Sequence, residues 1–272
     1  MKRTTIVLII LTLVCAVVQA QNSPLNMGYK KALFIGAHPD DNESCAGGTM
    51  ILLQKQGCEV VSVYMTSGER GIKGASLDEA ASIRRKELAE ACKVMGVRYR
   101  LMTQIDGQSE INAERYKEML QVIEEEKPDV VFTHWPIELH RDHRNCSALV
   151  LDAWKHSGRN CDLYYYEAEL GQQTRNFSPN SYVNIESVVE QKHKALLCHE
   201  SQKPQEILTN GTTTWKNSEA GSPSVPLPRP LCFSRKPETN NRKTHYEKET
   251  FIFVLHPAGS NPFHHFSITS KA

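Results

Sequence analysis

Short apolar runs alternate with longer amphipathic segments along this 272-residue chain, and this alternation constrains its fold more than any other feature. The apolar runs, which predict strands, lie at 31–37, 59–65, 98–101, 129–133, 163–166 and 182–185. The segments with a helical period lie at 47–56, 78–95, 112–126, 145–155 and 186–198. Strand and helix in alternation predict βαβ units, and therefore a three-layer α/β fold with a mostly parallel sheet and helices on both faces.

The composition limits the partners that such a fold can take. Hydrophobic residues make up 40% of the chain, which is enough for one globular core, and charged residues make up 23% with a net charge of +1. This balance gives no bias toward nucleic acid or an anionic membrane surface. We therefore expect a small molecule or a neutral polymer as partner, and no nucleic acid.

Residues 1–20 predict a secretory signal peptide. Lys2 and Arg3 precede an apolar stretch at 6–18, and small residues at 18–20 form a cleavage pattern. The apolar stretch is shorter than the roughly 20 residues that a membrane span needs, so no stable span is expected. The sequence predicts export to the periplasm or the medium, with cleavage near Ala20.

The cysteines give no framework of predicted disulfides. Eight are present, and the seven that follow the signal are scattered singly without a CxxC pair. We expect most of them to be small buried apolar residues. An odd number also leaves at least one thiol free.

Ligand-type side chains follow two of the predicted strands. Carboxyl ends of parallel strands gather at one edge of a sheet, where such folds bind ligands, so the two sets are expected to converge. The residues are His38, Asp40, Asp41 and Glu43 in FIGAHPDDNESCAGGTM (34–50), and His134, His140, Asp142 and His143 in HWPIELHRDHRNCS (134–147).

Two interpretations of the first set are open. Pro39 and the two aspartates that follow could form only a turn or a helix start. That interpretation requires Asp40, Asp41 and Glu43 to be solvated, which fits poorly behind an apolar strand. Two histidines and a carboxylate with one open position are instead the ligand set of a catalytic zinc site.

The motifs Ala-His-Pro-Asp-Asp-x-Glu and His-x-x-Asp-His resemble those of the PIG-L, or LmbE-like, family of zinc-dependent N-acetylglucosaminyl deacetylases. The resemblance covers about residues 30–206 and implies a Rossmann-like fold for a domain at 21–206. Further matching stretches are Gly47-Gly48-Thr49, Thr66-Ser67-Gly68-Glu69, Arg84 with Glu87, Met95-Gly96-Val97, Pro128-Asp129-Val130-Val131, Lys194-Ala195-Leu196 and His199-Glu200-Ser201-Gln202.

The resemblance implies roles for four residues. His38, Asp41 and His143 would hold Zn²⁺, although such ligands also accept Fe²⁺ or Co²⁺. Asp40 would be the general base, taking a proton from water whose pKa zinc lowers to about 7. The activated water would then attack the carbonyl carbon of an acetamide.

Three further side chains complete the expected site. His140 would stabilise or protonate the reacting centre as an imidazolium. Asp142 is expected to orient one of the two histidines as a hydrogen-bond acceptor, or to cap the helix that begins near His143. Glu43 is expected to support the ligand loop through backbone hydrogen bonds.

Nearby residues have simpler interpretations. Arg84 and Glu87 predict a charge pair on one helix face. Glu69 and Arg70 lie in a glycine-rich loop that either reaches substrate hydroxyls or is solvated. Trp135 either stacks on a sugar or packs in the core.

The implied function is removal of the acetyl group from an N-acetylglucosamine-type sugar or glycoconjugate by a zinc-dependent hydrolase. Two alternatives stay open. One is a related amide hydrolase acting on another acylated amino sugar, since pocket loops determine substrate choice. The other is an inactive sugar- or metal-binding pseudo-enzyme with an altered C-terminus.

Residues 207–272 differ in character from the rest of the chain. They contain four prolines between 223 and 230 and a polar run at 236–250, with scarcely any helical or strand period, which predicts disorder. The family would end on an aromatic, charged helix and a strand carrying Glu-Ala-Phe. The codons that can encode the residues after about Ile207 also permit this helix and this strand in a shifted reading frame. We therefore hypothesise that the gene is translated out of frame from about Ile207, and DNA sequencing tests this. A frameshift would remove the last strand and expose a sheet edge.

Overall fold

The structure is a computed structural model that describes residues 28–158, 160–168, 173–177, 181–205, 208 and 250–256. The predicted signal peptide at 1–20 and most of the segment 207–272 lie outside the described residues. Within the part described, helices and strands alternate as the sequence predicts.

The elements follow the chain in βα order. The strands are β1 (Lys31–Gly36), β2 (Glu59–Thr66), β3 (Arg98–Gln104), β4 (Val130–His134), β5 (Asp162–Tyr166), β6 (Ser181–Asn184) and β7 (Thr250–His256). The α-helices are α2 (Asp41–Lys55), α3 (Leu77–Met95), α4 (Ala113–Glu126), α5 (Arg141–His156) and α6 (Val189–Leu197). Two short 3₁₀ turns, η2 (Glu186–Val188) and η3 (Glu200–Gln202), flank α6.

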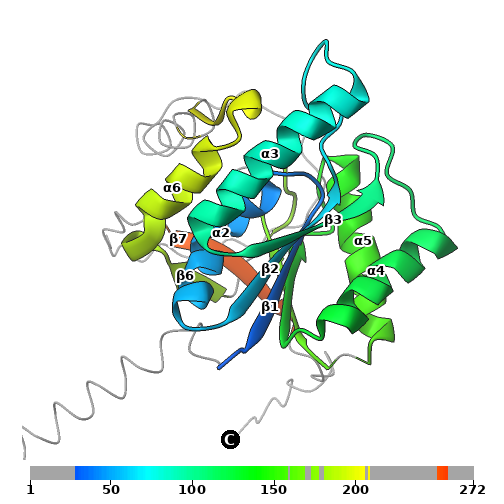
Figure 1. Ribbon diagram of the computed structural model, residues 1–272. Coiled ribbons are helices and arrows are strands. Elements are labelled where there is room, and N and C mark those ends of the chain that lie inside the picture. The colour runs from blue at the N-terminus through cyan, green and yellow to red at the C-terminus, as the bar shows by residue number, and fades with distance from the viewer. Residues whose placement is uncertain are drawn as a thin grey trace, which may run out of the picture.

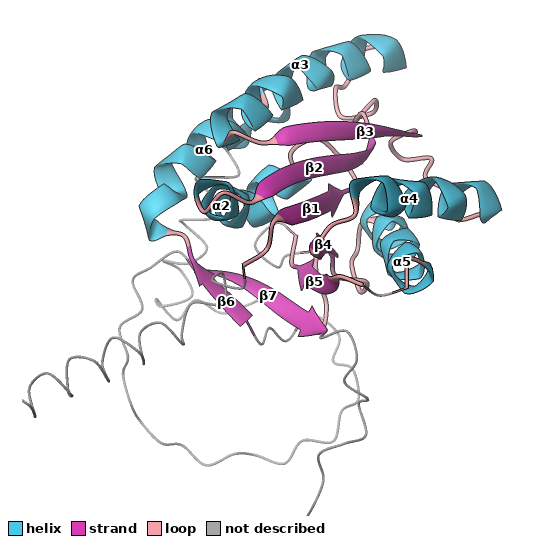
Figure 2. Cartoon of the chain, turned by 60° about the horizontal axis from the view of Figure 1, so that its bottom comes forward, coloured by secondary structure: helices cyan, strands magenta, loops and turns pink. Residues whose placement is uncertain are grey.

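All seven strands belong to one sheet in the order β3-β2-β1-β4-β5-β7-β6. The first five in this order pair in parallel, whereas β7 pairs antiparallel with both β5 and β6. Figures 1 and 2 show α2, α3 and α6 on one side of the sheet and α4 and α5 on the other. The prediction of a three-layer α/β fold with a mostly parallel sheet is confirmed.

The core lies on both faces of the central strand β1, because its side chains alternate between them. Ala32 and Phe34 belong to the apolar cluster under α2, α3 and α6, and Leu33 and Ile35 belong to the cluster under α4 and α5. The Phe34 ring stacks on Phe132 of the neighbouring strand with ring centroids 4.2 Å apart. A strand covered on both faces reads as a continuous apolar run, which explains the sequence pattern.

Two helices begin earlier than predicted. Helix α2 starts at Asp41 rather than 47, and α5 starts at Arg141 rather than about 145. Their first turns are buried through polar side chains, which an apolar period cannot reveal. Asn42, for example, is fully buried, and its amide donates to the carbonyl oxygens of Phe34 and Val63.

Strand β7 corrects the expectation that no regular strand follows residue 206. Its backbone pairs with Leu163 through Tyr166 of β5 on one side and with β6 on the other. The sequence TFIFVLH is a short run of strand-forming residues, but polar and proline-rich residues around it hid the signal. The edge of β5 is therefore covered in this structure, and the frameshift hypothesis stays a prediction about the gene.

Two other expectations concern the described residues alone. Five of their cysteines, at 45, 58, 92, 146 and 161, are buried, as expected, while Cys198 is half-buried. None of the helices described is both long and apolar enough to cross a membrane.

Candidate active site

The two sets of ligand-type residues meet at the carboxyl ends of β1 and β4. These strands are neighbours in the sheet, so the loops that follow Gly36 and His134 lie side by side. Ligand atoms of the histidines and carboxylates there lie within 4.8 Å of one another in three overlapping groups. The groups are His38 with His140 and His143, Asp41 with His134 and His143, and His38 with Asp106 and Asp142.

Asp41 lies between the predicted metal-binding histidines. Its Oδ2 is 3.3 Å from Nδ1 of His38, and its Oδ1 is 3.3 Å from Nε2 of His143. Oδ2 also accepts the backbone N–H groups of Ala37 at 3.1 Å and of His38 at 2.7 Å. These backbone bonds fix the carboxylate at the first turn of α2, where the helix dipole favours negative charge.

The other ring nitrogen of His38 points to two carboxylates. Nε2 lies 3.2 Å from Oδ1 of Asp106 and 3.2 Å from Oδ2 of Asp142. Burial lowers the pKa of His38, but these two carboxylates and Asp41 outweigh it and hold the pKa well above its ordinary value. A proton on Nε2 leaves Nδ1 as the ring nitrogen that can face a metal.

His143 has a similar arrangement with different partners. Its Nδ1 lies 3.8 Å from Oε2 of Glu138, and its ring stacks on His134 with centroids 4.0 Å apart. Burial lowers the pKa of His143, but Asp41 and Glu138 raise it to about 9 overall. The Glu138 carboxylate is beyond hydrogen-bond distance of Nδ1, which has no hydrogen-bond partner among the described residues, so it acts on the ring through its charge.

His134 is a neutral supporting residue. It is fully buried, and Nε2 accepts the backbone N–H of Ala37 at 3.1 Å. Burial and the nearby His143 lower its pKa to about 4. Because Nε2 is an acceptor, its 3.3 Å approach to Asp41 is a contact between two acceptors and carries no ion-pair energy.

The chemistry of this donor set fits a divalent metal. His38 Nδ1, Asp41 and His143 Nε2 converge, and the outer ring nitrogens face carboxylates, as in carboxylate–histidine–metal sites. The raised pKa values of both imidazoles show that the surrounding carboxylates favour positive charge here. A divalent ion on the same three ligands would supply that charge.

Asp40 has a strained backbone at the N-cap of α2. Its φ of 106° lies in the left-handed region, which L side chains rarely adopt. Its Oδ2 lies 3.3 Å from Nη2 of Arg84. Burial raises the pKa of Asp40 to about 6, although Arg84 lowers it, and the charge on Asp41 adds to the rise.

The predicted charge pair between Arg84 and Glu87 is wrong. Arg84 is 3% exposed and donates to the carbonyl oxygen of Pro39 in addition to its contact with Asp40. Glu87 instead accepts the backbone N–H and hydroxyl of Ser201, each at 2.7 Å. The glycine-rich loop packs on the guanidinium, since a Cβ at Gly68 would lie 2.9 Å from Arg84 Cζ.

His140 lies in the site beside His38 and His143. Its ring centroid is 4.8 Å from that of His38 and 4.6 Å from that of His143. Burial lowers the pKa of His140, and the charges on these two rings lower it further. These surroundings disfavour the imidazolium form, and the role of His140 in the reaction stays a prediction.

Asp142 contacts His38, and it does not cap α5. The helix starts at Arg141 with His140 at the N-cap, and no side chain makes a cap hydrogen bond.

Glu43 is fully buried, but it accepts the Tyr64 hydroxyl at 2.6 Å and lies 3.5 Å from Nε2 of His199 rather than bonding to the backbone.

Sequence reasoning missed Asp106 and Glu138. Asp106 lies two residues after β3, but the predicted strand ended at 101, so its position near a strand end was not apparent. Glu138 lies within the second quoted motif, but its role depends on the approach of residues 173–177. Thr174 donates its hydroxyl to Glu138 at 3.2 Å, and this contact between distant segments leaves no sequence signal. Trp135 packs on Tyr165, in agreement with the core-packing interpretation, and its indole N–H donates to the carbonyl of Arg175.

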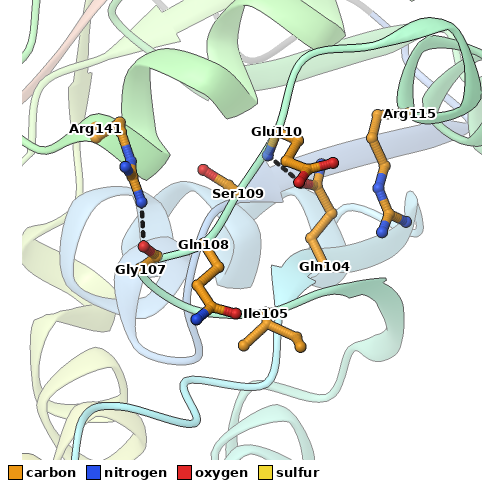
Figure 3. A pocket seen from close by; sticks show the side chains of 8 residues that line it. All are labelled: Gln104, Ile105, Gly107, Gln108, Ser109, Glu110, Arg115 and Arg141. Carbon is orange, nitrogen blue, oxygen red and sulfur yellow. Dashed lines mark hydrogen bonds between the residues drawn. The ribbon is translucent and has the colours of Figure 1, made fainter.

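A cavity of about 490 Å³ opens beside these residues (Figure 3). The loop after β3 forms one wall, and Arg115 of α4 and Arg141 of α5 extend from the facing helices. The lining is polar except for Ile105. The site therefore has room beside it for a hydrophilic group.

Comparison with known proteins identifies relatives. Residues 33–154 match the family model "PIG-L: GlcNAc-PI de-N-acetylase". A diacetylchitobiose deacetylase of Thermococcus kodakarensis is 32% identical over 201 residues, covering 68% of this chain and 74% of that protein. A probable N-acetyl-alpha-D-glucosaminyl L-malate deacetylase 2 of Bacillus cereus is 28% identical over 210 residues, covering 71% of this chain and 92% of that protein.

Solved structures share the fold. The N,N'-diacetylchitobiose deacetylase of Pyrococcus horikoshii matches with a TM-score of 0.65 at 24% identity, over 87% of this chain and 88% of that one. The family match spans both strand-end motifs, from β1 through most of α5. With a sequence relative above 30% identity and a shared architecture, this chain belongs to the PIG-L family of deacetylases.

Proposed function

We propose that this protein removes the acetyl group from an N-acetylglucosamine-type sugar or glycoconjugate, using a divalent metal, with zinc as the expected ion. The observation that carries the proposal is the position of Asp41, 3.3 Å from a ring nitrogen of both His38 and His143. The names of the two sequence relatives, both deacetylases of N-acetylated glucosamine compounds, support the substrate class.

In the proposed mechanism, His38, Asp41 and His143 hold the metal. When bound, the ion supplies a Lewis acid that polarises the acetamide carbonyl and acidifies water. Asp142 keeps the His38 imidazole oriented through its outer nitrogen, and the charge of Glu138 lies behind His143. The protein thereby fixes the ligand geometry before substrate arrives.

Asp40 and His140 carry the protons in this scheme. Asp40, anchored by Arg84, takes a proton from the attacking water at its carboxylate. His140, on the open side of the ligand set and half-buried, stabilises the developing oxyanion or delivers a proton to the amine that leaves. The products are acetate and the free amino sugar.

Export is a further part of the proposal, supported by the charged, apolar and small-residue regions at 1–20. An exported enzyme would meet extracellular or periplasmic glycans.

Acetate release from a panel of N-acetylated sugars tests the function. The panel contains N-acetylglucosamine, diacetylchitobiose, a malate glycoside of N-acetylglucosamine, and an N-acetylated amino acid as the non-sugar control. Release from at least one sugar, with none from the control, is the expected result. Release from the amino acid alone would contradict the proposed substrate class.

A further inference from the structure

The loop that follows β3 contacts Asp142, the carboxylate that lies behind His38. Gly107 donates its backbone N–H to Oδ2 of Asp142 at 2.6 Å, and Ser109 donates its hydroxyl to Oδ1 at 2.6 Å. Figure 3 shows both residues on this loop, at the wall of the cavity. Both oxygens of a fully buried carboxylate are therefore fixed by the same short segment.

Asn145 fixes the direction of the Ser109 hydroxyl. Its side-chain amide donates to Ser109 Oγ at 2.8 Å and to the Ser109 carbonyl oxygen at 3.0 Å. Because an amide nitrogen can only donate here, it occupies a lone pair of the hydroxyl oxygen, and the single hydroxyl proton points to Asp142. The chain of donors runs from Asn145 through Ser109 to Asp142.

This series of hydrogen bonds ends at His38, the predicted metal ligand. Asp142 Oδ2 lies 3.2 Å from Nε2 of His38, whose opposite nitrogen lies 3.3 Å from Asp41. We propose that Ser109 and Asn145 are positioning residues, which hold Asp142 in the orientation that aligns His38 for metal binding. The inference rests on the proposed function, because it requires His38 to be a ligand.

The geometry separates this role from simple anchoring of the loop. Gly107, with a φ of 70°, already holds the loop to Asp142 through its backbone, and no side chain is needed for that bond. Ser109 bonds the second carboxylate oxygen, whose other polar neighbour among the described residues is Arg141 Nε at 3.8 Å. Loss of the Ser109 hydroxyl would free the Asp142 side chain to rotate and leave the loop in place.

Zinc affinity of the full chain tests the proposal, measured by competition with a chromophoric chelator after metal removal. Ser109→Ala is expected to weaken zinc binding about tenfold, at the lower end of the range for groups behind metal ligands. Asn145→Ala should also weaken zinc binding. Ser109→Thr, which keeps the hydroxyl, should bind zinc with the affinity of the wild type. Unfolding of each metal-free variant is followed in parallel, so that a change in stability is distinguished from a change in affinity.

Ser147→Ala is the matched control. Ser147 lies on α5, as Asn145 does, and is 1% exposed. Its hydroxyl has no hydrogen-bond partner in the described structure. Its zinc affinity should equal that of the wild type. The proposal is overturned if Ser109→Ala and Asn145→Ala bind zinc as the wild type does, or if Ser147→Ala loses as much affinity as they do. A wild type that binds no divalent ion would overturn the proposed function as well, so the two failures are distinguishable.

Discussion

Asp40 and Asp41 are neighbours in the chain with opposite surroundings. Burial raises the pKa of Asp41, but His143 and His38 outweigh burial and hold it well below its ordinary value. Asp40 has one guanidinium partner at 3.3 Å, and its pKa is about 6. One aspartate is therefore a permanent anion suited to a metal, and the other can exchange a proton near neutral pH.

Replacement of Asp40 by Asn tests this division of roles. The amide keeps the shape of the side chain but cannot accept a proton from water, so the rate of acetate release should fall by about 10²–10⁴-fold. Metal content should stay at the wild-type level, because Asp41 and both histidines are unchanged. Wild-type activity in Asp40→Asn, or loss of metal, would refute the assigned role.

At the residue scale, the sequence motifs predict which side chains gather but not all of their contacts. His38, Asp41 and His143 follow strands, and the order of strands in the sheet brings them together. Asp106 and Glu138 were missed because single acidic residues in loops carry no pattern. Burial and the neighbouring His38 and His143 lower the pKa of His140, an effect of spatial arrangement that the sequence does not show.

At the scale of elements, polar burial explains why helix starts were misplaced. Asn42 in the first turn of α2 is fully buried and bonds Phe34, Ser62 and Val63, and it accepts the hydroxyl of Tyr166. A periodicity search finds helices through apolar residues, so it begins α2 only at 47. The six strands before residue 206 were located through their apolar runs, although β3 extends further than predicted and β7 was missed.

Asn42→Ala is expected to destabilise the protein by about 2–3 kcal/mol, because the partners of the amide stay buried without it. Denaturant unfolding of the metal-free protein measures the change in free energy. Lys55→Ala, an exposed position in the last turn of the same helix, is the control and should change stability by less than about 0.5 kcal/mol. Equal stability of both variants would contradict the structural role of Asn42.

The end of the sheet opposite the site predicts a pH dependence of stability. Glu126 closes α4, and its carboxylate lies 2.7 Å from Nη2 of Arg98 and 2.8 Å from Nζ of Lys31. Hydrogen bonds from Arg98 lower the pKa of Glu126 to about 2, and those from Lys31 contribute despite the opposing effect of burial.

Because the folded pKa of Glu126 lies below its unfolded value, its contribution is fully present above about pH 4.5 and is lost as the pH falls toward 2. The contribution is about 1–2 kcal/mol after allowance for screening at the half-exposed Arg98. The wild type should therefore lose more unfolding free energy between pH 6 and pH 3 than Glu126→Gln does. Glu124→Gln, an exposed change on the same helix, should follow the wild type. Parallel pH profiles for the wild type and Glu126→Gln would contradict this account.

At the scale of the whole molecule, β7 joins a late segment of the chain to the sheet. It lies between β5 and β6, so the sheet order depends on residues far from the family motifs (Figure 2). The motif-bearing part was predictable because each βα unit is local in sequence. The position of β7 depends on pairing over a long sequence separation, which a single sequence does not reveal.

Val254→Pro tests the place of β7. Val254 pairs with Tyr165 of β5, and a proline there has no backbone N–H to donate and a fixed φ that disfavours pairing within a sheet. Stability should fall by about 2–4 kcal/mol, as read from thermal unfolding. Val254→Thr keeps the backbone donor and serves as control. A proline variant that unfolds at the same temperature as the wild type would show that this segment is not part of the sheet.

The central claim is that the clustered histidines and carboxylates form the metal site of a deacetylase. Its most direct test is acetate release by the full chain after removal of metal and after restoration of one equivalent of zinc, with Asp41→Ala in parallel. The account predicts no release without metal, recovery at about one zinc per chain, and neither zinc binding nor release in Asp41→Ala. Acetate release that persists in the metal-free protein, or in Asp41→Ala, would contradict it.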